Sequence, residues 1–144
     1  MPFEIECKAE KINNSRGYYI VYASVDAFPY STDSYQVKND YQIGRYDLYK
    51  WKNGSRSLES VWSAKSKGPN VWKIRYYGDN NHRILIDGTQ RLTCSDNEYT
   101  SGYIVFGNWG GPSDVAMRYY YIRVRKYTFP EPTVTSIEAE QAAP

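Results

Sequence analysis

Paired carboxylates are the first feature of the chain to test for chemistry. Hydrolysis of a glycosidic bond needs two carboxylates a few ångströms apart on one face. Glu4 and Glu6 share a parity in the segment Phe3–Glu10, but Lys8 has the same parity, which is typical of a solvated charged face. The Glu-x-Asp-x-x-Glu spacing that sets such a pair on one strand does not occur. The sequence therefore argues against a glycoside hydrolase.

Nucleophilic, phosphate-binding and metal chemistry have little more support. His82 is the sole histidine and stands in the turn Asn80–Arg83, so we expect it to be exposed. One histidine cannot build a multi-histidine metal site or a supported catalytic triad. No helix pattern follows Gly110 and Gly111 to present backbone amides to a phosphate. Loop Asp and Asn residues leave a calcium ion open, with its ligands unassigned.

The aromatic residues favour binding. The chain holds 16 tyrosines and 4 tryptophans against 4 phenylalanines, and such polar-tipped rings suit half-exposed sheet faces and binding surfaces. Trp109 and its neighbour Asn108 stand in an expected glycine-rich loop, Asn108–Ser113, where a ring has little core to fill. An exposed ring there could stack on the face of a sugar.

A second candidate lies on one expected strand. Asp47, Tyr49 and Trp51 share parity in Arg45–Trp51, which would form a sheet-face platform of two rings and a carboxylate acceptor. The alternative is that these rings point inward and build the core. Trp62 and Trp72 stand among apolar strand residues, so we expect both in the core.

Two cysteines, Cys7 and Cys94, lie far apart in sequence and share parity with apolar neighbours. Buried free thiols and a disulfide between Cys7 and Cys94 are both open. A bridge would fit an oxidising compartment.

The whole chain reads as short strands separated by turn residues. Asn53-Gly54 and Asp87-Gly88 are strong hairpin signals. Ten strands at spacings of about 8–12 residues predict a sandwich or barrel. The expected strands are Phe3–Glu10, Tyr18–Val25, Tyr35–Tyr41, Arg45–Trp51, Ser57–Ala64, Val71–Tyr77, Arg83–Ile86, Gln90–Cys94, Tyr103–Gly107 and Met117–Thr128.

The last strand carries the domain boundary. Strict alternation predicts that Ile122 and Val124 close the core, while Arg123, Arg125 and the tyrosines of their parity face outward. Pro130 and Pro132 lack backbone donors and stop the sheet. We therefore expect one domain over residues 1–132 and a linker or tail over residues 133–144.

The composition limits the partners. Eighteen basic against 16 acidic residues give a net charge of +2, which is too even to favour nucleic acid. No apolar run approaches the ~18 residues that a membrane span needs, and Met1–Glu6 has no signal-peptide pattern.

The order of these signals resembles the concanavalin A-like, laminin G-like jelly-roll domains, an all-β class built as a two-sheet antiparallel β-sandwich. Three segments carry the resemblance: the Trp72-led run Asn70–Thr89, the Gly-led strand Ser101–Gly107 and the closing strand Tyr121–Arg125. The ending Arg123–Val134 resembles domains of large archaeal surface and secreted proteins. Tyr119–Tyr121 departs from the acidic residue that many relatives carry there.

The resemblance implies a non-catalytic binding or adhesion module, outside the cell or at its surface, with a glycan or a surface protein as its partner. It would belong to a larger multidomain chain. Two alternatives stay open. One is an assembly domain of a filament, virion or surface layer, and the other is a hydrolase, because jelly rolls include glycoside hydrolases and fold alone does not choose between them.

Overall fold

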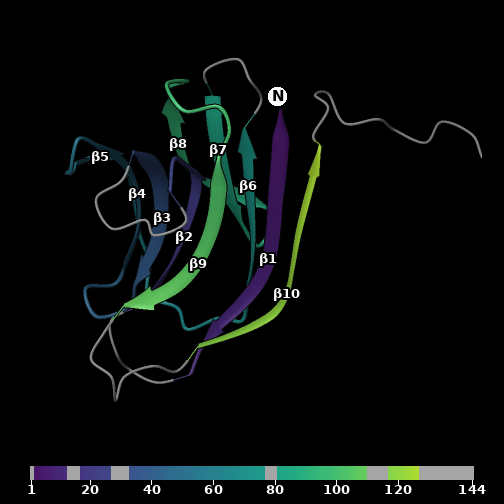
Figure 1. Ribbon diagram of the computed structural model, residues 1–144. Coiled ribbons are helices and arrows are strands. Elements are labelled where there is room, and N and C mark those ends of the chain that lie inside the picture. The colour runs from purple at the N-terminus through teal and green to yellow at the C-terminus, as the bar shows by residue number, and fades with distance from the viewer. Residues whose placement is uncertain (1, 13–16, 27–32, 77–80, 110–116, 127–144) are drawn as a thin grey trace, which may run out of the picture.

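The computed structural model describes residues 2–12, 17–26, 33–76, 81–109 and 117–126. These residues form ten strands, and each lies within two residues of the bounds expected from the sequence (Figure 1). The strands are β1 (Phe3–Lys11), β2 (Gly17–Ser24), β3 (Ser34–Asp40), β4 (Arg45–Lys52), β5 (Ser55–Ser63), β6 (Asn70–Tyr76), β7 (Asn81–Ile86), β8 (Thr89–Ser95), β9 (Tyr103–Trp109) and β10 (Met117–Lys126).

Two five-stranded antiparallel sheets make a sandwich. The first, which we call the β1 sheet, has the order β10-β1-β6-β7-β8, and the second, the β4 sheet, has the order β5-β4-β3-β2-β9. The expected all-β, two-sheet antiparallel sandwich is confirmed. Among the described residues there is no helix, and so none that is long and apolar enough to cross a membrane.

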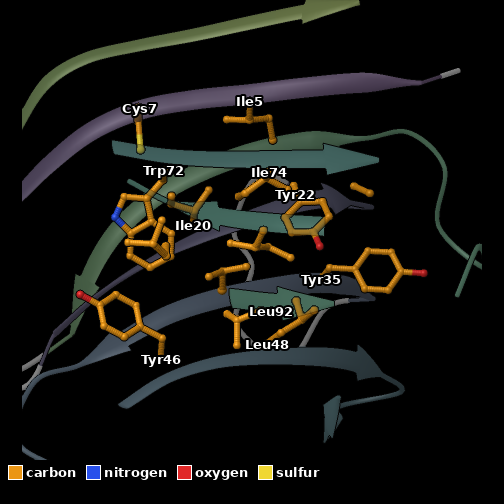
Figure 2. Packing of buried hydrophobic residues seen from close by; sticks show 14 of the residues in the cluster. Ile5, Cys7, Ile20, Tyr22, Tyr35, Tyr46, Leu48, Trp72, Ile74 and Leu92 are labelled. Atoms are coloured by element: carbon orange, nitrogen blue, oxygen red, sulfur yellow. The ribbon is translucent and has the colours of Figure 1, made fainter. Parts of the chain in front are cut away.

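The core lies between the two sheets. Ile5, Cys7, Trp72 and Ile74 of the β1 sheet face side chains such as Leu48 of the β4 sheet (Figure 2). Trp72 is fully buried and Trp62 packs against the cluster at its border, as expected from their apolar surroundings.

The core is also rich in tyrosine, contrary to the expected tyrosine-clad faces. Five tyrosine rings are completely buried: Tyr18, Tyr22, Tyr35, Tyr46 and Tyr76. The hydroxyls of Tyr18, Tyr35 and Tyr46 find partners, as buried polar groups must. Trp72 Nε1 donates to the Tyr18 hydroxyl at 2.9 Å, the Tyr46 hydroxyl donates to Asn70 Oδ1 at 3.2 Å, and the Tyr35 hydroxyl donates to Asp96.

His82 is also buried, which corrects the expectation of an exposed turn residue. Strand β7 begins at Asn81, one residue before it, and pairs His82 with Tyr76 and Cys94. The imidazole points inward, has no exposed surface and lies 4.3 Å from the ring centre of Tyr35.

The acidic side chains on the outer face of the β1 sheet form close ion pairs and hydrogen bonds instead of being surrounded by solvent. Glu4 is only 1% exposed, because Arg75 Nε donates to it at 2.6 Å and Arg125 Nε donates to it at 2.9 Å. Glu6 similarly accepts a hydrogen bond from Tyr121 and pairs with Arg123 at 2.9 Å. The expectation of solvated carboxylates here is wrong for Glu4.

Strand β10 departs from strict alternation. A register shift opposite Lys8 and Ala9 turns Tyr119 toward the core, where its ring meets Phe106 at 5.2 Å, while Tyr121 stays outside. Ile122 and Val124 do lie opposite core residues of β1, but they are 45% and 53% exposed. The expectation that they close the core is therefore wrong.

The exposure of β10 follows from the way the two sheets meet. At one edge β5 and β8 touch, and Thr93 N donates to Ser60 Oγ at 3.3 Å. At the other edge β9 and β10 diverge and leave a pocket of about 240 Å³. It is lined by Phe3, Ala23, Thr100, Ser101, Gly102, Ile104 and Val124.

The expected domain end at residue 132 and the tail 133–144 lie outside the described residues.

Candidate functional site

Asp47, Tyr49 and Trp51 lie together on the outer face of the β4 sheet. Alternation along β4 sends Tyr46 and Leu48 into the core and these three side chains to the opposite side. All three side chains lie on the face that their shared parity predicts, and the alternative that they point into the core is wrong. Asp47 and Tyr49 are 0% and 5% exposed, so Trp51 is the accessible member of the three.

A polar network fixes the centre of this face. The Tyr49 hydroxyl donates to Asp47 Oδ2 at 3.1 Å, and Arg45 Nε forms an ion pair with Asp47 Oδ1 at 2.7 Å. The Lys38 ammonium lies 3.8 Å from both Asp47 and Asp40. These partners cover Asp47 so completely that it has no exposed surface, although it points away from the core.

Trp51 and Arg56 form the accessible part of the face, because Tyr49 is only 5% exposed. The Arg56 guanidinium lies 4.4 Å from the ring centre of Tyr49 and 5.9 Å from that of Trp51, which is cation–π distance. Trp51 is half-buried and donates from Nε1 to Gln36 Oε1 at 3.0 Å. Both rings are thus held in place by polar neighbours.

Tyr19 adds a third ring to the same face. It pairs with Lys38 on one side and with Gly107 on the other. A Cβ atom at position 107 would lie only 2.5 Å from the Tyr19 ring, so glycine lets the ring lie across β9. We call the surface formed by Tyr19, Lys38, Asp40, Arg45, Asp47, Tyr49, Trp51 and Arg56 the β4 face.

Burial and ion pairing set the protonation of this network. Burial lowers the pKa of Lys38, and the nearby Arg56 charge adds to this effect. Burial and the Asp47 carboxylate raise the pKa of Tyr49, which keeps its hydroxyl protonated as a donor. Burial alone would lower the pKa of Arg45, but its bonds to Tyr49 and Asp47 outweigh that and raise it.

The other two expected site residues, Trp109 and Asn108, lie on strand β9. Trp109 is the last residue of β9, with its backbone opposite Gly17, so it ends a strand instead of standing in the expected loop. Its side chain lies outside the described part. Asn108 pairs with the core residue Tyr18, so it belongs to the inner side of the sheet.

Sequence reasoning missed Lys38, Arg45 and Arg56. The alternation of Lys38 and Asp40 in β3 was a usable signal, since both fall on one face. Arg56 was beyond reach, because a register shift between Leu48 and Tyr49 decides which β5 residue meets Trp51.

The two cysteines are free and buried. Cys7 on β1 and Cys94 on β8 belong to the same sheet with two strands between them. Three strand spacings amount to about 14 Å. A disulfide needs Cα atoms within about 7 Å, so the open question of a bridge resolves to free thiols. Within the described ranges, no group of three or more His, Cys, Asp or Glu side chains is arranged to hold a metal ion.

Comparison with known proteins supports the fold. No protein-family model matches the chain, and no curated protein matches it. Among solved structures, it is similar to carbohydrate binding module CBM66 from Bacillus subtilis, with a TM-score of 0.67 and 18% identity over 87% of this chain and 75% of that one.

Two further solved structures are similar. Sheep galectin-11, in complex with glycerol, gives a TM-score of 0.64 at 11% identity and covers 86% of this chain and 90% of that one. The carbohydrate recognition domain of Emp47p gives 0.62 at 12% identity and covers 88% and 72%. At such low identity these similarities establish the jelly-roll sandwich fold, as the sequence resemblance implied.

Proposed function

We propose that this protein is a non-catalytic carbohydrate-binding module and that its binding site is the β4 face. The observation that carries the proposal is the half-exposed ring of Trp51 beside a fixed network of polar and charged groups, in which the buried Tyr49 lies under Arg56. Aromatic rings pack against the apolar faces of sugars, and fixed donors and acceptors bind their hydroxyls. The similarity to a carbohydrate binding module, a galectin and a carbohydrate recognition domain supports this function.

The pairing of the carboxylates supports binding over catalysis. Asp47 is held by Arg45, Lys38 and the Tyr49 hydroxyl, and Asp40 pairs with Lys38. A glycosidase needs one carboxyl that gives up a proton and a second that acts as base or nucleophile. On the described part of the β4 face, each carboxylate is instead in an ion pair.

An extracellular or cell-surface setting, a role in adhesion and membership of a larger chain are further parts of the proposal. They rest on the resemblance of the closing strand to domains of surface and secreted proteins. A surface protein is the alternative partner.

Affinity electrophoresis through gels containing different polysaccharides tests the binding function. We expect retardation of the wild type and a loss of affinity of about tenfold or more in Trp51→Ala. Tyr120→Ala is the matched control, because Tyr120 is an exposed ring, 46% accessible, on β10 of the other sheet. Absence of retardation in every gel, or equal retardation of wild type and Trp51→Ala, contradicts the proposal.

A further inference from the structure

We propose that the glycan bound by the β4 face is acidic, and that Arg56 recognises its carboxylate or sulfate group. This inference rests on the proposed function and names the ligand class for that site. It starts from the one cation of the face that has rings and no carboxylate as its partners.

The other two cations of the face are already paired. Arg45 is bound to Asp47, and Lys38 lies between Asp47 and Asp40. In the part of the chain that the structure describes, the attractive contacts of Arg56 are those with the rings of Tyr49 and Trp51. Three basic groups thus stand against two acidic ones on this face, and the excess charge sits at Arg56.

The stacked position of Arg56 leaves its donors available. A guanidinium lying over a ring uses its flat face, while its five N–H donors point outward in the plane of the group. Arg56 is exposed, so these donors are open to a ligand. Their fork matches two oxygens of one carboxylate or sulfate, which is the strongest kind of charged hydrogen bond in proteins.

The hairpin between β4 and β5 places this charge beside the sugar-stacking ring. Asn53 and Gly54 take positive φ values of 50° and 77°, as the tight turn between two strands requires. Two residues further on, Arg56 stands directly opposite Trp51 in the ladder. A sugar stacked on Trp51 would therefore hold a substituent within reach of Arg56.

Two pairs of polysaccharides with matched backbones test the inference. Polygalacturonate is compared with its methyl ester, and dextran sulfate with dextran. We expect the wild type to bind at least one acidic member about tenfold more tightly than its neutral partner. Raising the salt from about 0.05 to about 0.5 M should narrow that difference, because ions screen the exposed charge.

Substitution at Arg56 tests the named residue. Arg56→Gln should remove the preference for the acidic member over its neutral partner. Arg56→Lys should keep only part of it, since lysine lacks the fork. Arg91→Gln is the matched control, because Arg91 also stacks at 4.4 Å on a ring, that of Trp62. Its removal changes the net charge equally, away from the β4 face.

The outcomes separate this inference from the proposed function. Equal binding of both members in both pairs overturns the acidic preference and leaves carbohydrate binding standing. An acidic preference that survives in Arg56→Gln, or falls equally in Arg91→Gln, overturns the role of Arg56. A preference within only one pair tells carboxylate from sulfate recognition and supports the inference. No binding to any of the four polysaccharides overturns it.

Discussion

Tyr22 and His82 meet across the interface of the two sheets, with the Tyr22 hydroxyl 3.1 Å from Nδ1 of His82. The other ring nitrogen, Nε2, lies 2.7 Å from the backbone carbonyl oxygen of Asp96. A carbonyl only accepts, so Nε2 carries the hydrogen and Nδ1 accepts from the tyrosine. Burial lowers the pKa of His82 below 6.5, so the ring is neutral at neutral pH and this tautomer is the one that fits its two partners.

Acid should destabilise the fold through this histidine. Burial lowers the pKa of His82 below its ordinary value of 6.5. The unfolded chain then binds a proton that the folded chain does not bind. The free energy of unfolding therefore falls as the pH drops below about 6.5 toward the lowered pKa. Urea denaturation at pH 7, 6 and 5 should show a loss of up to about 1.4 kcal/mol per pH unit.

The histidine is the sole one in the sequence, so this pH window isolates it. Glu4 and Asp96 have pKa values lowered below 4.5 and 3.8 and respond only at more acidic pH. His82→Gln should flatten the slope between pH 6.5 and 5. An equal slope in this variant would assign the acid sensitivity to other groups.

Loss of the Glu4 charge should weaken the β1 sheet. Glu4→Gln removes the carboxylate that accepts from both Arg75 and Arg125, and hydrogen bonds to buried charged groups contribute about 1.5–3 kcal/mol. Glu10→Gln, whose partners Arg118 and Tyr120 are both exposed, should cost clearly less. Similar losses in both variants, measured by urea denaturation, would show that the double pairing of Glu4 has no special weight.

Gly107→Ala should couple to Tyr19. The new methyl group would lie 2.5 Å from the tyrosine ring, so the ring must leave its place on the β4 face. We expect a loss of about 1–2 kcal/mol for Gly107→Ala alone and a smaller additional loss when Tyr19→Ala is already present. A double-mutant cycle by thermal denaturation measures the coupling, and strict additivity would mean that the ring moves aside freely.

Both thiols should be inert in the folded protein. Burial raises the pKa of Cys7 and of Cys94 to about 12, so hardly any reactive thiolate is present at neutral pH. Ellman's reagent should label neither cysteine in the native state and both in urea. Rapid labelling of the native protein would show that one of the two sites opens easily, and non-labelling in urea under non-reducing conditions would reveal a disulfide.

The strands could be predicted because their signals are local. Alternation and turn residues such as Asn53-Gly54 act within one hairpin, and every expected strand is present. The inward turn of His82 was missed because the pairing with Tyr76 on β6, and not the nearby Asn residues, fixes its direction. Parity along one strand also placed Asp47, Tyr49 and Trp51 on one face.

The remaining errors come from relationships between distant segments. The parity of Ile122 and Val124 was right, but their burial depends on whether β9 lies opposite β10, which no single strand encodes. Arg56 likewise reaches Trp51 only through the register shift in the β4–β5 ladder. Shifts and sheet divergence are tertiary outcomes of packing, so alternation alone does not predict them.

The buried tyrosines have a consequence in alkali. Burial raises the pKa of Tyr46 to about 12 and raises those of Tyr18, Tyr22 and Tyr35 further above the ordinary value of 10. The unfolded chain releases these phenolic protons first, so stability is complete below about pH 10 and is lost as the pH rises beyond it. A core of phenylalanine has no hydroxyl to ionise and would not lose stability in this way. The buried tyrosines thus lower the stability of the fold in alkali, and the buried His82 lowers it in acid. The fold is therefore most stable in neutral and mildly alkaline solution.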